Sequence, residues 1–148
     1  MANNDDALSV IHELIETCRD GETGYLHASA IVSDPQLKAH FQKQSEERHT
    51  FIQELRQEAT RLGEEETDTS GSTAGMLHRI WFESKADLGL GDAAVLSSVD
   101  SGEESAKKTY EKALEATLPD DLRAIITAQA QCVFDAHNRI LILREKAA

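Results

Sequence analysis

The chain is poor in the residues on which several common classes of protein depend. Only two of its 148 residues are cysteine, two are proline, and aromatic residues make up 5%. Because Cys18 and Cys132 lie far apart and are too few for a disulfide scaffold, we interpret both as small buried hydrophobic residues. The scarcity of aromatic residues, with recurrent Ala, Leu, Glu, Lys and Gln, favours helices packed through aliphatic side chains over a sheet.

Positive charge and long apolar runs are scarce as well. There are 15 Lys and Arg residues against 27 Asp and Glu residues, so the formal net charge is −12. No basic stripe offsets this acidity, which argues against nucleic acid as a partner. No run reaches the roughly 20 apolar residues of a membrane span, and the beginning of the chain lacks the basic region of a signal peptide. We therefore expect a cytoplasmic protein that binds neither nucleic acid nor membranes.

What the sequence does contain is apolar side chains at three- and four-residue spacing, which predicts a single all-α domain over residues 1–148. Asp34 followed by Pro35 is a typical helix start, and Gly63 is a typical helix end. Asp92 is expected to cap a later helix. The helices are predicted at about 5–32, 35–62, 73–88, 92–117 and 119–146, with a flexible acidic loop at about 63–72.

Polar residues interrupt the apolar seams of these helices near their middles. The seam of the first helix is predicted to consist of Leu8, Ile11, Ile15, Cys18, Glu22, Tyr25, Ser29 and Val32. A carboxylate such as that of Glu22 is costly in a core unless a cation, a metal or hydrogen-bond donors meet it. The other long helices also carry polar residues at mid-seam. The sequence therefore predicts a buried polar centre that contains Glu22, Gln44, Arg48, Glu103 and Gln129.

One interpretation of this centre is structural. Glu22 and Arg48 both lie near the middle of their helices, so an antiparallel hairpin would bring them together as a buried ion pair. The hydroxyls of Tyr25 and Tyr110 and the two glutamines would satisfy the remaining hydrogen bonds. Such a pair adds little net stability but fixes the register of the helices.

Several stretches of the chain resemble an uncharacterised bacterial family of ferritin-like four-helix-bundle proteins, and together they extend through almost its whole length. They are Leu8-Ser9-Val10-Ile11 through Cys18-Arg19-Asp20-Gly21-Glu22, Ser45-Glu46-Glu47-Arg48 with Phe51 and Glu54-Leu55, Leu77-His78-Arg79 with Trp81, and His137-Asn138-Arg139-Ile140 with Leu143-Arg144. The resemblance implies an antiparallel bundle with an additional short helix in the crossover between the second and third long helices. It implies no particular activity.

A second interpretation of the polar centre is a metal site. Ferritin-like proteins with a metal pair use one Glu from each of two helices and Glu-x-x-His from each of the other two. Glu-x-x-His occurs in the second helix, with both members predicted to point outward, and it is absent from the last helix because Phe134 stands three residues before His137. The ligands of an iron or manganese site would then be Glu22, Glu103 and His137, with Glu46 and His49 as less suitable alternatives.

Two classes of function follow from these interpretations. No Ser-His-Asp set, Cys-x-x-Cys pair or phosphate-binding glycine loop occurs, so we expect no catalytic residues of those types. The first class is a non-enzymatic interaction or stress-related protein, with the polar centre in place of a complete di-metal site. The second is a di-iron or di-manganese oxidase, peroxidase or metal-storage protein. Apolar residues outside the predicted core indicate a homo-oligomer, most simply a dimer: Ile31, Leu114, Ile125, Leu141 and Ile142.

Overall fold

A computed structural model describes residues 4–64 and 91–147 of the chain. These residues form four helices and no strand: α1 (Asn4–Ile31), α2 (Pro35–Arg61), α4 (Gly91–Glu115) and α5 (Asp120–Ala147). They occupy the ranges expected for the four long helices. The short helix expected at 73–88 and nearly all of the loop expected at 63–72 lie outside the described residues. No helix in the described part of the chain is both long enough and apolar enough to span a bilayer.

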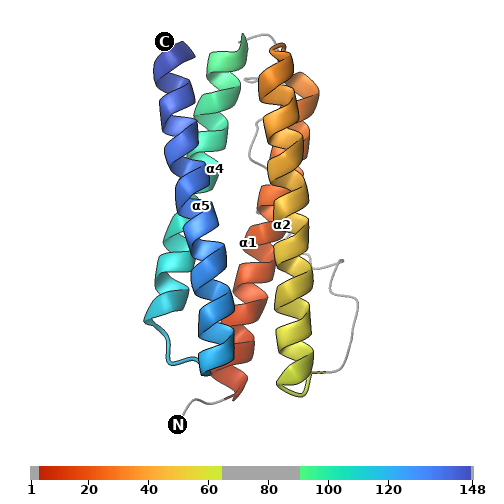
Figure 1. Cartoon of the computed structure of the whole chain (residues 1–148), viewed down its shortest axis with the longest axis vertical. Coiled ribbons are helices and arrows are strands. Elements are labelled where there is room, and N and C mark those ends of the chain that lie inside the picture. The colour runs from red at the N-terminus through yellow and green to blue at the C-terminus, as the bar shows by residue number, and fades with distance from the viewer. Residues whose placement is uncertain (1–3, 65–90, 148) are drawn as a thin grey trace.

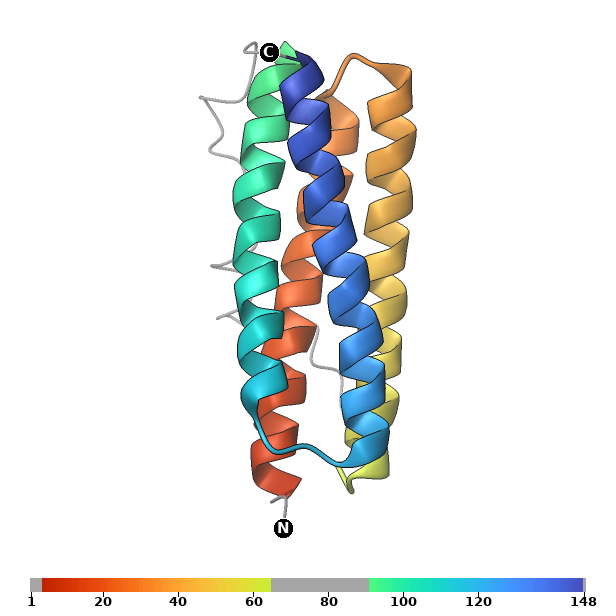
Figure 2. The same cartoon turned by 60° about the vertical axis from the view of Figure 1, so that its left-hand side comes forward.

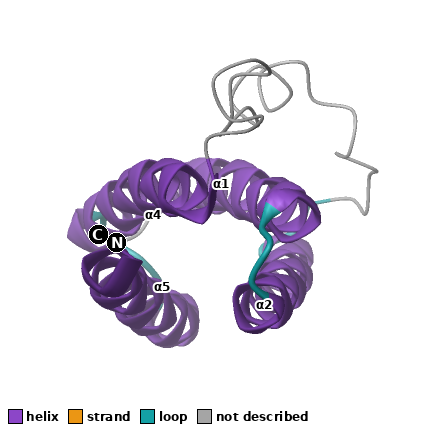
Figure 3. Cartoon of the chain, turned by 90° about the horizontal axis from the view of Figure 1, so that it is seen from above, coloured by secondary structure: helices purple, strands orange, loops and turns teal. Residues whose placement is uncertain are grey.

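The four helices stand side by side as an elongated antiparallel bundle (Figures 1 and 2). α1 and α5 run in one direction, and α2 and α4 run in the other. Seen along its axis, the bundle is a ring in which α1 lies between α2 and α4, and α5 follows α4 (Figure 3). Of the neighbouring pairs in this ring, α1 and α2 pack most extensively, and α2 and α5 pack least.

The ends of α2 follow directly from its sequence. The carboxylate of Asp34 accepts a hydrogen bond of 2.8 Å from the backbone N–H of Gln36, and Pro35 is the first helical residue. This arrangement satisfies one of the free N–H groups of the first turn, and proline there sacrifices no helical hydrogen bond. After Arg61 the chain turns at Gly63, whose φ of +100° favours glycine.

Asp92 has a different role from the one expected. It lies in the first turn of α4, and its carboxylate accepts hydrogen bonds from the backbone N–H groups of Ser33 (2.8 Å) and Asp34 (3.0 Å). Asp92 therefore ties the beginning of α4 to the connection between α1 and α2. This contact joins the two helical hairpins at one end of the bundle.

The buried apolar residues form two clusters, one toward each end of the bundle. On α1, for example, the first cluster extends from Ala7 to Cys18 and the second begins at Tyr25. Between the clusters, the other helices place buried polar side chains at mid-height: Gln44, Ser45 and Arg48 on α2, Asp100 and Glu103 on α4, and His137 on α5. The candidate site therefore lies where the apolar core is interrupted.

Candidate functional site

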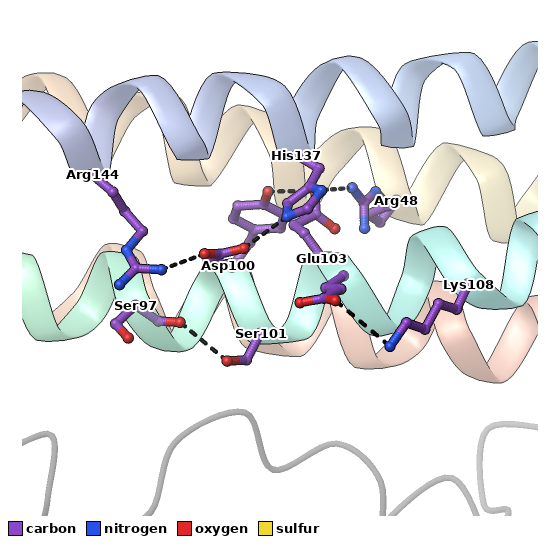
Figure 4. Close-up of polar contacts among 10 residues, drawn as sticks. Arg48, Ser97, Asp100, Ser101, Glu103, Lys108, His137 and Arg144 are labelled. Carbon is purple, nitrogen blue, oxygen red and sulfur yellow. Dashed lines mark hydrogen bonds and ion pairs between the residues drawn. The ribbon is translucent and has the colours of Figure 1, made fainter.

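An ion pair between Arg48 of α2 and Glu103 of α4 occupies the middle of the bundle. Both side chains are fully buried, and Arg48 Nη2 lies 2.5 Å from Glu103 Oε2 (Figure 4). The hydroxyl of Tyr25 donates to the same oxygen at 2.6 Å. The guanidinium carbon also lies 5.4 Å from the centre of the Tyr25 ring, a favourable cation–π distance. We call these three residues, together with the neighbouring Gln44, the arginine centre.

The carboxylate of Glu103 influences the protonation of both Arg48 and Tyr25. Burial by itself would lower the pKa of Arg48, but the facing carboxylate of Glu103 raises that pKa above its ordinary value. The pKa of Tyr25 is well above its ordinary value because the phenol is buried and lies beside Glu103. Arg48 therefore stays a cation, and Tyr25 stays a protonated hydrogen-bond donor to the carboxylate.

Gly21 of α1 makes room for the guanidinium. A Cβ atom at this position would lie 2.7 Å from Arg48 Nη1 and 3.2 Å from Arg48 Cγ, closer than van der Waals contact allows. Glycine therefore lets the arginine side chain lie directly against the backbone of α1. This explains why a residue that weakens helices stands in the middle of a long one.

Glu22 does not belong to the arginine centre, so the predicted Glu22–Arg48 pair is wrong. The Glu22 side chain is 33% exposed, and its Oε2 lies 2.9 Å from Nδ1 of the exposed His49. The buried face of α1 passes through Gly21 instead.

The sequence of α1 allows two alternative buried seams with seven-residue spacing. Both seams contain Ile11, Cys18, Tyr25 and Val32. The predicted seam adds Leu8, Ile15, Glu22 and Ser29, whereas the alternative adds Ala7, Leu14, Gly21 and Ala28. Side-chain hydropathy did not distinguish these phasings, because a glycine gives no hydrophobic signal.

A second buried polar group joins α4 to α5, one helical turn along α4 from Glu103 of the arginine centre. His137 Nε2 lies 2.7 Å from Asp100 Oδ1, and Arg144 donates to the other oxygen of the same carboxylate (Figure 4). Burial would raise the pKa of Asp100, but the bonds to His137 and Arg144 lower it overall. The sequence prediction missed Asp100. Two signals were available in the sequence. Asp100 lies three residues before Glu103, so both lie on one face of a helix, and His137 and Arg144 share a face in the same way because they are seven residues apart.

A third group contains Gln129, which is buried as expected but is bonded elsewhere. Tyr110 donates its hydroxyl proton to Gln129 Oε1 at 2.8 Å, so the thiol of Cys18, at 3.1 Å, donates to Tyr110. The Gln129 amide nitrogen in turn donates to Glu54 (2.9 Å) and to a backbone carbonyl of α2 (3.3 Å). Burial raises the pKa of Cys18 to about 11, which keeps its thiol protonated. Cys18 and Cys132 are both free.

An antiparallel up-down-down-up bundle with polar side chains at its centre defines the class of this protein: it is an all-α protein with a ferritin-like fold. More particularly, the chain belongs to the family described as domain of unknown function DUF2383, whose family model matches residues 6–116. This membership agrees with the resemblance to an uncharacterised ferritin-like family drawn from the sequence.

A solved structure supports the assignment of the fold. It is that of a two-domain protein from Anabaena variabilis that contains a DJ-1/ThiJ/PfpI-like domain and a ferritin-like domain. The TM-score is 0.79 at 14% sequence identity, and the match covers 99% of the present chain. It covers only 38% of the Anabaena protein, so the chain spans well under half of that relative. A search of curated proteins found no match.

The residues at the centre do not fit the metal pair of many ferritin-like proteins. The cationic guanidinium of Arg48 lies against Glu103 and would repel a metal ion there, while one Glu103 oxygen already accepts two hydrogen bonds. In residues 4–64 and 91–147, no group of three or more His, Cys, Asp or Glu side chains is arranged to hold a metal ion. The structure separates the candidate ligands: Glu22 pairs with His49, Glu103 with Arg48, and His137 with Asp100, while Glu46 is exposed.

Proposed function

We propose that this protein is a non-enzymatic, cytoplasmic ferritin-like interaction module in which an arginine takes the place of the metal ions. The observation that carries the proposal is the fully buried Arg48–Glu103 ion pair, with Tyr25 as a further donor to the carboxylate. The positive charge that neutralises the Glu103 carboxylate is therefore the guanidinium of Arg48, a side chain of the protein itself. A guanidinium, unlike an iron or manganese ion, does not change its oxidation state. Its role is to hold α2 and α4 in one register.

Metal analysis of the purified protein tests this proposal. After expression in medium supplemented with iron and manganese, we expect well below one equivalent of either metal per chain by inductively coupled plasma mass spectrometry. The physical reason is the repulsion between a metal ion and the buried guanidinium. Glu103→Gln and Glu22→Ala variants serve as controls and should contain the same background amount. About two equivalents of metal in the wild type, lost in either variant, would overturn the proposal and support a di-metal protein.

An interaction module needs a surface through which it acts, and we assign this surface to the C-terminal part of α5. Leu141 and Ile142 are adjacent there and are 44% and 48% exposed. Of the other apolar residues expected at an interface, Ile31 and Leu114 are partly buried against the protein's own core, so their contribution to an oligomer is smaller than expected. The proposed occupant of the α5 surface is a second copy of the chain. The Anabaena protein contains a ferritin-like domain together with another domain in one chain, so a ferritin-like domain is one module of a larger protein there.

Sedimentation velocity tests the α5 surface. We expect the wild type to sediment as a dimer and Leu141→Glu/Ile142→Glu to sediment as a monomer, because burying two carboxylates in an apolar interface is costly. Leu26→Glu is the matched control, since Leu26 is an exposed leucine (58%) on α1. This control should remain dimeric. A monomeric wild type, or a dimer that only Leu26→Glu disrupts, would contradict the assignment.

A further inference from the structure

The arginine centre and its neighbour His137 contain buried polar atoms that bond to no other group in the described chain. These atoms are Nε and Nη1 of Arg48, Oε1 of Glu103, Oε1 of Gln44 and Nδ1 of His137. Each of the four side chains is at least nine-tenths buried. Native proteins rarely leave such atoms without a partner, because a buried donor or acceptor has lost its bonds to bulk water; an ordered internal water is a common partner.

These atoms gather at one level of the bundle rather than being scattered through it. Gln44 precedes Arg48 by one turn on α2, so both side chains lie on the same face. Glu103 bonds to Arg48 through Oε2, and its free Oε1 belongs to the same carboxylate. His137 bonds to Asp100, which precedes Glu103 by one turn on α4. The atoms therefore come from three helices that meet at the polar level between the two apolar clusters.

The unpartnered atoms are also chemically complementary. Arg48 contributes only donors, whereas the free oxygens of Glu103 and Gln44 are acceptors. A molecule that satisfies both must accept a hydrogen bond from the guanidinium and donate one to an oxygen. It must also be small and uncharged, because the Arg48–Glu103 pair is already balanced in charge and the surroundings are apolar. Water has these properties.

We infer that the arginine centre is a binding site for internal water, which accepts a hydrogen bond from Arg48 and donates to both Glu103 Oε1 and Gln44 Oε1. Internal waters of this kind bond to two to four polar groups, and the centre offers that number. The water completes the arginine centre, so that the guanidinium, the carboxylate and the Gln44 amide act as one connected unit across α2 and α4. This inference depends on the geometry of the centre and not on the proposed interaction function.

Magnetisation transfer from water to the Arg48 side chain tests the site. In a ¹⁵N-edited water-NOE spectrum, we expect a cross-peak between the Arg48 Nε–H and the water resonance. The Nε–H signal is assigned by its disappearance in Arg48→Lys. Tyr25→Phe is the essential control, because an exchanging phenol hydroxyl could relay the magnetisation, and the cross-peak should persist in that variant. Its absence from the folded wild type, or its loss in Tyr25→Phe, would overturn the inference.

A substitution at Gln44 gives an independent measurement. Gln44→Met keeps the approximate volume of the side chain but removes the acceptor that water would bridge to Arg48. If water binds there, the variant should melt at a temperature lower by roughly 3 °C, as expected for the loss of one hydrogen bond in a protein of this size. If Gln44 Oε1 instead has no partner, its removal should leave the melting temperature unchanged or raise it. That outcome would overturn the inference.

Discussion

Arg48→Met is expected to lower the free energy of unfolding by about 3–5 kcal/mol, because it leaves the carboxylate of Glu103 buried without its cation. The measurement is urea denaturation followed by circular dichroism at neutral pH. Arg56→Met is a matched control, since Arg56 is an exposed arginine on the same helix. It should change the free energy of unfolding by no more than about 0.5 kcal/mol.

Replacing both partners separates the loss of an ion pair from the loss of packing. In Arg48→Met/Glu103→Leu no buried charge remains, so most of the stability lost in Arg48→Met should return. Arg48→Met/Glu22→Ala should be no more stable than Arg48→Met, because Glu22 faces His49 at the surface. Recovery with the change at Glu22 rather than at Glu103 would mean that the sequence-based pairing is right and the assignment of Glu103 as partner is wrong.

Gly21→Ala is expected to have effects of opposite sign in two backgrounds. In the wild type, the new Cβ atom would lie 2.7 Å from Nη1 of the Arg48 guanidinium, which the bond from its Nη2 to Glu103 holds in place. Overpacking of this kind costs about 1–3 kcal/mol, which should outweigh the gain of about 1 kcal/mol from replacing a mid-helix glycine with alanine. In Arg48→Met/Glu103→Leu the guanidinium is absent, and the only close contact that remains is with Cγ, at 3.2 Å in Arg48. A flexible methionine side chain can shift to relieve that contact, so the same substitution should stabilise the protein.

A double-mutant cycle measures the interaction between Gly21 and the ion pair. Its four proteins are the wild type and Arg48→Met/Glu103→Leu, each with and without Gly21→Ala. We expect a coupling free energy of about 1–3 kcal/mol, obtained from chemical denaturation of each variant. Equal effects of Gly21→Ala in the two backgrounds would show that the contact between Arg48 and α1 is not a packing constraint.

Several features of the fold could be predicted because their causes are local. Asp34 and Pro35 begin α2, and Gly63 follows its end, through capping geometry that depends on neighbouring residues. The long helices follow from side-chain periodicity, which a bundle preserves. The burial of Arg48 could be predicted in the same way, because the apolar residues around it on α2 define a single seam.

The partners of the polar residues could not be predicted in this way. Glu22 and Gly21 differ by about 100° around α1, and both candidate seams contain enough apolar residues to form a core. The correct phase becomes visible only when Arg48 is placed against Gly21, which is a contact between two helices. Asp100 was missed for a related reason, since its burial depends on His137 and Arg144 of a different helix.

The sequence by itself determined that this protein is an acidic, all-α bundle with polar residues at the middle of its helices, because composition and helical periodicity are properties of single segments. Only the tertiary structure decided that Glu103 rather than Glu22 neutralises Arg48, and that the candidate metal ligands are divided among separate ion pairs. The reason is that Arg48 and His137 each take their partner from another helix, α4. The rotation and height of that helix depend on the packing of the whole bundle.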